Sequence, residues 1–120
     1  MTIAKGDKIP ATTFVKMTEN GPDQVDSDSF FKGRKVAIFS VPGAFTPTCS
    51  AKHLPGFVEK ADELKAKGVD EIACTAVNDA FVMGAWGKSA SADGKVTMLA
   101  DGNGAFAKAV GLEMDGSKFG

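Results

Sequence analysis

A cysteine follows a proline-rich loop in this sequence, in a setting suited to nucleophilic thiol chemistry. Residues 42–49 read PGAFTPTC, directly after the apolar run 36–41, and Cys49 stands at the start of a predicted helix. The amide end of a helix favours the thiolate, which is the attacking form of cysteine. A thiolate can break the O–O bond of a peroxide and become a sulfenic acid. Cys49 is therefore the candidate nucleophile, and the competing interpretation is a small buried cysteine without chemistry.

Two further residues of the same loop fit this chemistry. Thr46 can place its hydroxyl beside the Cys49 sulfur and a bound peroxide. Pro42 has no N–H and a fixed φ, so it shapes the loop and helps to exclude water from the thiolate. We predict Cys49, Thr46 and Pro42 as the catalytic residues.

The second cysteine and the single histidine are weaker candidates. Cys74 lies in the apolar stretch 71–77 and is a candidate resolving thiol, which would have to reach disulfide distance from Cys49. A residue in a central strand moves little, so the favoured interpretation is a small buried residue. His53 is predicted to pack or to form hydrogen bonds rather than to act as a base. One histidine and two cysteines lie at no zinc spacing, so we predict no metal and no cofactor.

The rest of the chain alternates strand and helix signals. Apolar runs predict strands, polar residues followed by periodic apolar residues predict helices, and residues 18–23 are predicted as a turn. The predicted strands are 12–17, 35–41, 71–77 and 96–100, and the predicted helices are 26–31, 48–53, 55–67, a helix capped by Asn78 or Asp79, and one capped by Asn103. The strand 35–41 is apolar at nearly every position, which indicates burial on both faces. Repeated strand–helix units predict an α/β fold with a parallel sheet.

Composition and charge narrow the function classes. The chain has 120 residues, enough for a single domain over 1–120, and 43% of them are hydrophobic. The net charge is −1, which implies no basic surface for nucleic acid. No apolar run is long enough to cross a membrane, and the first residues show neither a signal peptide nor a transit peptide. Two cysteines without a secretory signal favour a reducing compartment, and we expect a cytoplasmic protein.

Several segments of the sequence resemble one family. The pattern Pro-x-x-x-Thr-x-x-Cys in PGAFTPTC, together with HLPGF, VNDAFVMGAW and LADGNGAFAKAVGLEMD, resembles the type II, or peroxiredoxin-5-like, branch of the peroxiredoxins. The resemblance implies a thioredoxin-like fold, in three α/β/α layers around a mostly parallel sheet. It also implies an antioxidant oxidoreductase that reduces hydrogen peroxide and alkyl hydroperoxides through a sulfenic acid at Cys49. The implied reductant is thioredoxin, glutaredoxin or glutathione.

The resemblance also bears on assembly and on completeness. It implies a homodimer, with Phe45, Phe81 and Trp86 as contact candidates, although core packing explains Trp86 equally well. It further implies an active-site arginine in a strand that would begin where this sequence stops, at Gly120, so the domain is expected to be shortened. We accordingly expect slower turnover and lower stability than in a complete homologue. The alternative function is a weakened redox-sensing or interaction module on the same scaffold.

Overall fold

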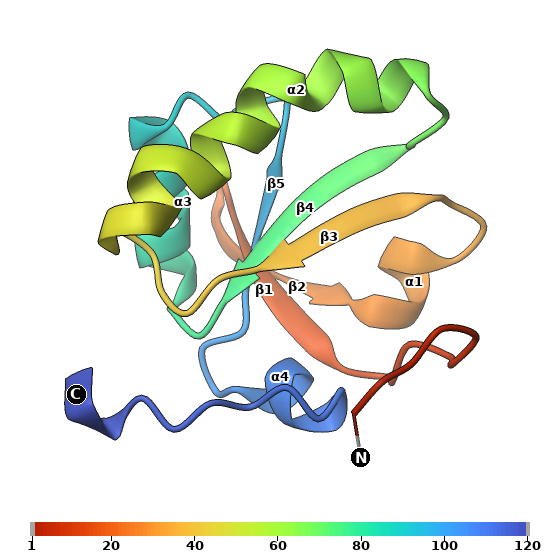
Figure 1. The fold of residues 1–120 in the computed structure, drawn as a ribbon, viewed down its shortest axis with the longest axis vertical. Coiled ribbons are helices and arrows are strands. Elements are labelled where there is room, and N and C mark those ends of the chain that lie inside the picture. The colour runs from red at the N-terminus through yellow and green to blue at the C-terminus, as the bar shows by residue number, and fades with distance from the viewer. Residues whose placement is uncertain (1, 120) are drawn as a thin grey trace.

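A mixed five-stranded sheet forms the centre of the computed structural model, which describes residues 2–119 (Figure 1). The strand order is β2-β1-β5-β4-β3. The strands are β1 (Thr13–Thr18), β2 (Gly21–Asp26), β3 (Val36–Ser40), β4 (Glu71–Ala76) and β5 (Thr97–Ala100). The helices are α1 (Ser27–Phe31), the π-helix η1 (Cys49–His53), α2 (Leu54–Ala66), α3 (Ala80–Ser89), α4 (Ala105–Ala109) and the 3-10 helix η2 (Ser117–Phe119).

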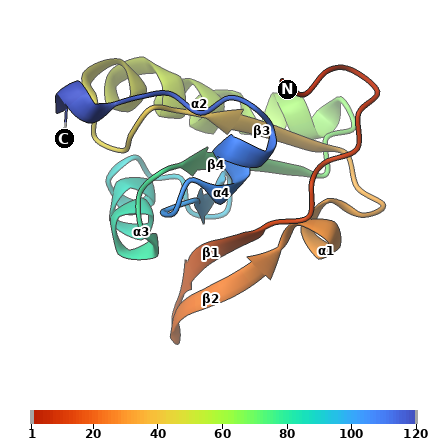
Figure 2. The same ribbon diagram turned by 90° about the horizontal axis from the view of Figure 1, so that it is seen from below.

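The sheet combines a parallel and an antiparallel half. β3, β4 and β5 pair in parallel through the crossover helices α2 and α3. β1 pairs antiparallel with β2 along its whole length and with β5 at Val15 and Ala100. Figure 2 shows this progression, from β3 beneath α2 to the β1–β2 hairpin at the far side of the molecule. The predicted α/β, thioredoxin-like fold is confirmed, with a sheet that is mixed because of the N-terminal hairpin.

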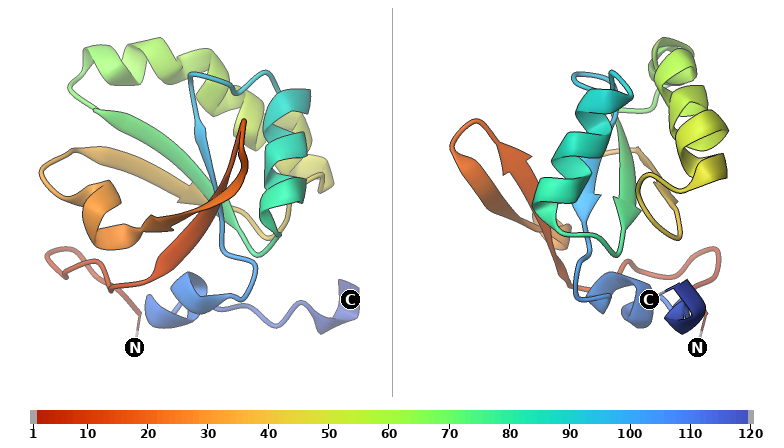
Figure 3. Two further views of the ribbon diagram at one scale, coloured as in Figure 1. Left: turned by 180° about the vertical axis from the view of Figure 1, so that it is seen from behind. Right: turned by 90° about the vertical axis from the view of Figure 1, so that its left-hand side faces the viewer.

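Alternating side chains of the strands bury two apolar clusters, one on each face of the sheet. On β4, Ile72 and Cys74 face the cluster shared with α2 and α3, whereas Ala73 faces the other cluster. That second cluster contains Phe14 of β1 and Phe106 of α4, whose ring centroids are 4.9 Å apart. Helices therefore cover both faces, with α4 on the face away from α2 (Figure 3).

One predicted turn and one predicted strand differ from the structure. Residues 18–23 do not form only a turn, because β2 begins at Gly21 and includes Pro22. β2 lies at the edge of the sheet, where a proline needs no partner for its missing N–H. The expectation that residues 35–41 are buried on both faces is wrong, because β3 forms the other edge of the described sheet and is mostly half-buried.

The helix after Cys49 is continuous rather than broken. A π-helical turn spans Cys49–His53 and leads directly into α2, with Pro55 in the first turn of α2. Proline has no N–H to donate, and its ring would clash with the carbonyl four residues earlier in a regular α-helix, so the ladder of hydrogen bonds is interrupted at this point. The two predicted segments 48–53 and 55–67 are therefore joined through a widened turn, a feature that often marks functional sites.

The helices α3 and α4 begin where carboxylate side chains accept from their free N–H groups. The Asp79 carboxylate accepts from the Val82 N–H at the start of α3, at 2.8 Å. Of the two predicted caps, Asn78 and Asp79, the structure therefore has Asp79. The prediction of Asn103 as the cap of α4 is wrong. The buried Asp101 carboxylate accepts from the N–H groups of Phe106 and Ala107 instead, both at 3.0 Å. No helix among residues 2–119 is long and apolar enough to cross a membrane.

Candidate active site

Cys49 lies at the junction between the loop that follows β3 and the π-helical turn η1. The strand β3 ends at Ser40, and the backbone N–H of Val41 still bonds to Thr75 of β4, which fixes where the loop leaves the sheet. Cys49 is the first residue of η1, and its side chain is only 7% exposed. The sulfur therefore lies at the amide end of the η1–α2 helix in largely apolar surroundings, which is the position predicted for the nucleophile.

Thr46 is held so that its hydroxyl oxygen is available as an acceptor. The Thr46 hydroxyl donates to the carbonyl oxygen of Gly43 at 2.8 Å, and the Thr46 carbonyl accepts from the N–H of Ser50 at 2.9 Å. The proton of the hydroxyl is thus committed to the loop, while its lone pairs can accept a hydrogen bond from an incoming O–H group.

Pro42 stands at the start of the same loop with its side chain exposed. It is one residue beyond Val41, which is buried, so it shapes the loop from the outside. Its predicted role in shielding the thiolate from water stays a prediction.

Cys74 lies in the same apolar cluster as Cys49, on the neighbouring strand β4. Both cysteines are free thiols, and Cys74 is completely buried. Burial, and secondarily the charge of Cys49, raises the pKa of the Cys74 thiol to about 12. A thiol with such a pKa stays protonated near neutral pH and is a poor nucleophile, because the thiolate is the attacking form.

The three aromatic residues proposed as dimer contacts separate into a core residue and two surface residues. Trp86 is 1% exposed and belongs to the buried cluster of Cys49. Phe45 is 55% exposed and Phe81 is 65% exposed. Val77, which directly follows β4, is also exposed. Phe45 has a positive φ of 61°, a conformation uncommon outside glycine, and its ring centroid is 6.4 Å from that of Trp86.

Two contacts of the site were missed by sequence reasoning. The side-chain oxygen of Asn78 accepts a hydrogen bond from the N–H of Ala44 at 2.8 Å. The indole N–H of Trp86 donates to the Ser50 hydroxyl at 3.0 Å. The only sequence signal for Asn78 was its position directly after a strand that precedes a helix, and that signal predicted a cap rather than a contact with the loop.

His53 packs beside the edge strand β3, and a surface groove runs along the same η1–α2 helix. The His53 ring is 4.9 Å from the Phe39 ring and 5.8 Å from the Phe57 ring, which agrees with the predicted packing role. An apolar groove of about 630 Å³ runs past these residues along α2. Cys49, Thr46 and Pro42 do not line this groove, so it is distinct from the thiol site.

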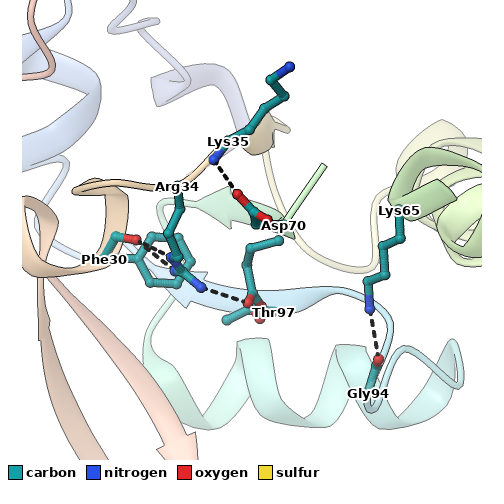
Figure 4. A network of polar contacts seen from close by, with 8 residues as sticks. Phe30, Arg34, Lys35, Lys65, Asp70, Gly94 and Thr97 are labelled. Carbon is teal, nitrogen blue, oxygen red and sulfur yellow. Dashed lines mark hydrogen bonds and ion pairs between the residues drawn. The ribbon is translucent and has the colours of Figure 1, made fainter. Parts of the chain in front are cut away.

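The single arginine lies at the opposite end of the sheet from Cys49. Figure 4 shows Arg34 donating twice to the Phe30 carbonyl, at 2.9 and 2.6 Å. The guanidinium also pairs with Glu71 at 3.1 Å and lies 4.7 Å from the centre of the Phe30 ring. Arg34 and Glu71 stand where β3 and β4 begin, whereas Cys49 follows the end of β3. Arg34 therefore serves the structure at that end and does not reach the thiol.

No group of three or more histidine, cysteine, aspartate or glutamate side chains gathers as metal ligands would within residues 2–119.

Comparisons with known proteins agree on one family. The model of the Redoxin family matches residues 4–119. The chain is 54% identical over 114 residues to Peroxiredoxin-2B of Arabidopsis thaliana, a match that covers 94% of this chain and 70% of the relative. It is 50% identical to the chloroplastic Peroxiredoxin-2E of the same plant, where the match covers 95% of this chain and 50% of the relative.

Solved structures give the same picture. The crystal structure of reduced Prx3 from Vibrio vulnificus in complex with H2O2 superposes with a TM-score of 0.95 at 52% identity, over 99% of this chain and 75% of that one. Peroxiredoxin 5 from Alvinella pompejana superposes with a TM-score of 0.86 at 41% identity, over 97% of this chain and 73% of that one.

Proposed function

The chain belongs to the peroxiredoxins of the Redoxin family, and from this we propose that it is a thiol peroxidase that reduces hydrogen peroxide and alkyl hydroperoxides at Cys49. The observation that carries the proposal is the position of Cys49. Its sulfur is nearly buried at the amide end of a helix, one turn after a threonine whose hydroxyl oxygen can accept. The relative from Vibrio vulnificus, described in complex with H2O2, supports the substrate class.

The chemistry follows from this arrangement. The Cys49 thiolate donates an electron pair to the nearer oxygen of the peroxide, the O–O bond breaks, and the departing oxygen takes a proton to leave as water or an alcohol. The products are a sulfenic acid on Cys49 and one molecule of water or alcohol. The Thr46 oxygen is placed to accept the O–H of the peroxide, which would orient the oxygen under attack.

An external thiol regenerates Cys49 in this proposal. The raised pKa and complete burial of Cys74 support a cycle in which Cys74 does not attack the sulfenic acid. Thioredoxin, glutaredoxin or glutathione would supply the reducing thiol. Mass spectrometry without reductant, after one equivalent of peroxide, tests this step. A Cys49 sulfenic acid supports the external thiol, and a Cys49–Cys74 disulfide contradicts it.

The second partner in the proposal is another copy of the chain. Phe45, Phe81 and Val77 expose apolar side chains on neighbouring segments near the thiol loop, and such patches favour protein contacts. Light scattering of the protein and of Phe81→Asp tests the homodimer, which the charged side chain should dissociate. The cytoplasmic location also stays a prediction, since the similar relatives include a chloroplastic one.

The rate of Cys49 oxidation tests the peroxidase function itself. The second-order rate constant with hydrogen peroxide is measured by stopped flow, with Cys49→Ser as the blank. A rate well above that of a free thiol at the same pH is expected.

One observation favours the second candidate, a redox sensor. The single guanidinium of the sequence is held at the far end of the sheet, so it lends no positive charge to the thiolate. A rate no faster than that of a free thiol would favour the sensor and reject the peroxidase.

A further inference from the structure

We propose that Asn78 and Trp86 are positioning residues, which clamp the Cys49 loop from the α3 side and thereby set the rate of peroxide attack. This inference rests on the proposed peroxidase function. Asn78 directly precedes the cap of α3, and Trp86 lies within α3. Their hydrogen bonds reach the loop at Ala44 and Ser50, which lie on either side of the reactive cysteine.

The first bond of the clamp holds the loop before the cysteine. The Asn78 Oδ1 atom accepts from the Ala44 N–H at 2.8 Å, across 34 residues of sequence. The same oxygen is only 4.0 Å from the position that a β-carbon on Gly43 would occupy, so the side chain lies directly against the loop backbone. Gly43 is also the residue whose carbonyl holds the Thr46 hydroxyl. Asn78 thus fixes the peptide segment that orients Thr46.

Asn78 itself is held in place by the first turn of α3 and by the loop before α4. Its neighbour Asp79 is bound into the first turn of α3, through the N–H of Val82 to the carboxylate and the N–H of Met83 to the carbonyl oxygen. On the other side, a β-carbon on Gly102 would lie 3.4 Å from the Asn78 carbonyl oxygen, so the loop before α4 packs closely on this backbone. The acceptor oxygen is therefore presented to Ala44 by a rigid support.

The second bond of the clamp holds the turn after the cysteine. The Trp86 indole is 1% exposed, and its N–H donates to the Ser50 hydroxyl at 3.0 Å. A buried indole N–H needs a partner, because a buried donor without one loses its hydrogen bond to water and gains none in return. Ser50 in turn donates its backbone N–H to the Thr46 carbonyl. Trp86 therefore acts on the same threonine through the residues that follow the cysteine.

The clamp has a consequence for the reaction. The relative position of the Thr46 hydroxyl and the Cys49 sulfur depends on the backbone between Ala44 and Ser50. When a positioning contact is lost, a shift of about 1 Å can slow a reaction by about 100-fold, while the ionisation of the nucleophile stays the same. Loss of the clamp should therefore lower the rate constant with which the Cys49 thiolate attacks peroxide. The fraction of Cys49 that is thiolate should stay the same.

The test compares Asn78→Ala, Asn78→Asp and Trp86→Phe with the unmodified chain. The second-order rate of Cys49 oxidation by hydrogen peroxide is measured across pH, below the thermal unfolding midpoint of every variant. The alkaline plateau reports the thiolate alone. We expect Asn78→Ala to lower this plateau about tenfold or more. Trp86→Phe should lower it less, because phenylalanine loses the N–H donor but keeps an aromatic ring in the packed position. Asn78→Asp keeps an acceptor oxygen and should recover most of the plateau, although its charge moves the pH profile to higher pH.

Asn20→Ala is the matched control, because Asn20 is exposed in the β1–β2 turn. It should leave the plateau unchanged. An Asn78→Ala plateau equal to that of the unmodified chain, or an Asn78→Asp plateau as low as that of Asn78→Ala, would overturn the positioning role.

A second readout separates this proposal from the proposed function. Hydrogen exchange of the Ala44 amide should accelerate in Asn78→Ala and not in Asn20→Ala, and unchanged exchange would overturn the clamp whatever the activity. An unmodified chain that oxidises no faster than a free thiol would refute the peroxidase alone.

Discussion

At the scale of single residues, the two thiols lie in one apolar cluster, and we expect them to differ in reactivity. Cys49 stands at a helix end, next to the loop that follows β3, whereas Cys74 is completely buried in a central strand. Burial is the larger cause of the raised pKa of Cys74, and the charge of Cys49 adds to it. One apolar cluster therefore contains a thiol at a helix end and another that burial keeps protonated.

Alkylation of the native protein should reveal this difference. With iodoacetamide at about pH 8, we expect Cys49 to be modified and Cys74 to stay free, because only thiolates react appreciably. Peptide mass spectrometry gives the extent at each cysteine, and the urea-unfolded chain, in which both should react, is the control. Equal modification of Cys74 in the native and unfolded chains would contradict the raised pKa.

The raised pKa of Cys74 also predicts how stability depends on pH. The thiol loses its proton near its ordinary value of 9.0 in the unfolded chain and at about 12 in the folded one. Between these values the folded state binds more protons, so the free energy of unfolding falls as pH rises. The contribution is complete below about pH 9 and is lost as pH approaches about 12.

Urea unfolding at several alkaline pH values measures this slope. Cys74→Ala is the control and should lose stability less steeply over the same range, since the other titrating groups remain. Parallel slopes for the two proteins would show that Cys74 has an ordinary pKa.

At the scale of elements, the two capping aspartates should differ in their contributions. Asp101 is buried and accepts from two N–H groups of α4, whereas Asp79 is exposed and accepts from one N–H of α3. Removing an exposed cap costs about 1 kcal/mol. Asp101→Ala should cost about 2 kcal/mol or more, because buried N–H groups lose their acceptors.

Denaturant unfolding of both alanine variants measures the two costs. Asp101→Asn keeps one acceptor oxygen and should lie between Asp101→Ala and the unmodified chain. A larger loss for Asp79→Ala than for Asp101→Ala would refute this ranking.

The sequence predicted those elements whose signals are local. The strands β4 and β5 were recognisable from buried apolar runs, and the PGAFTPTC motif located the loop that leads to the candidate nucleophile Cys49. The strand β2 was missed because an edge strand pairs on one side only and needs little hydrophobicity. Asn103 was mistaken for a cap because the acceptor came from Asp101, which the turn through Gly104 brings back to the helix start.

The contacts that orient the site were beyond the reach of sequence patterns. The bonds from Asn78 to Ala44 and from Trp86 to Ser50 span 34 and 36 residues. Both depend on how α3 packs beside the loop, which no local pattern states. Sequence spacing thus predicted the reacting group, and only the tertiary structure showed what holds it in place.

At the scale of the whole molecule, the two ends of the parallel strands have different roles. The polar network of Arg34, Glu71 and Thr97 joins the starts of β3, β4 and β5 (Figure 4). The thiol loop leaves the opposite end, after Ser40. The five residues of β3 separate the two by about 16 Å at 3.3 Å per residue. A change in one end should therefore leave the other largely unaffected.

Glu71→Ala tests this separation. The variant removes the carboxylate that pairs with Arg34 and accepts from the Thr97 hydroxyl. Because the pair is about one-third exposed, we expect a loss of only about 1 kcal/mol in the free energy of unfolding. The rate of Cys49 oxidation should stay within about twofold of the unmodified chain, since distant sites act independently. Urea unfolding and stopped-flow oxidation of the same samples give both values, with the exposed Glu113→Ala as the control. A large fall in rate with Glu71→Ala would mean that the strands transmit strain from one end of the sheet to the thiol, and that stability and reactivity are coupled in this fold.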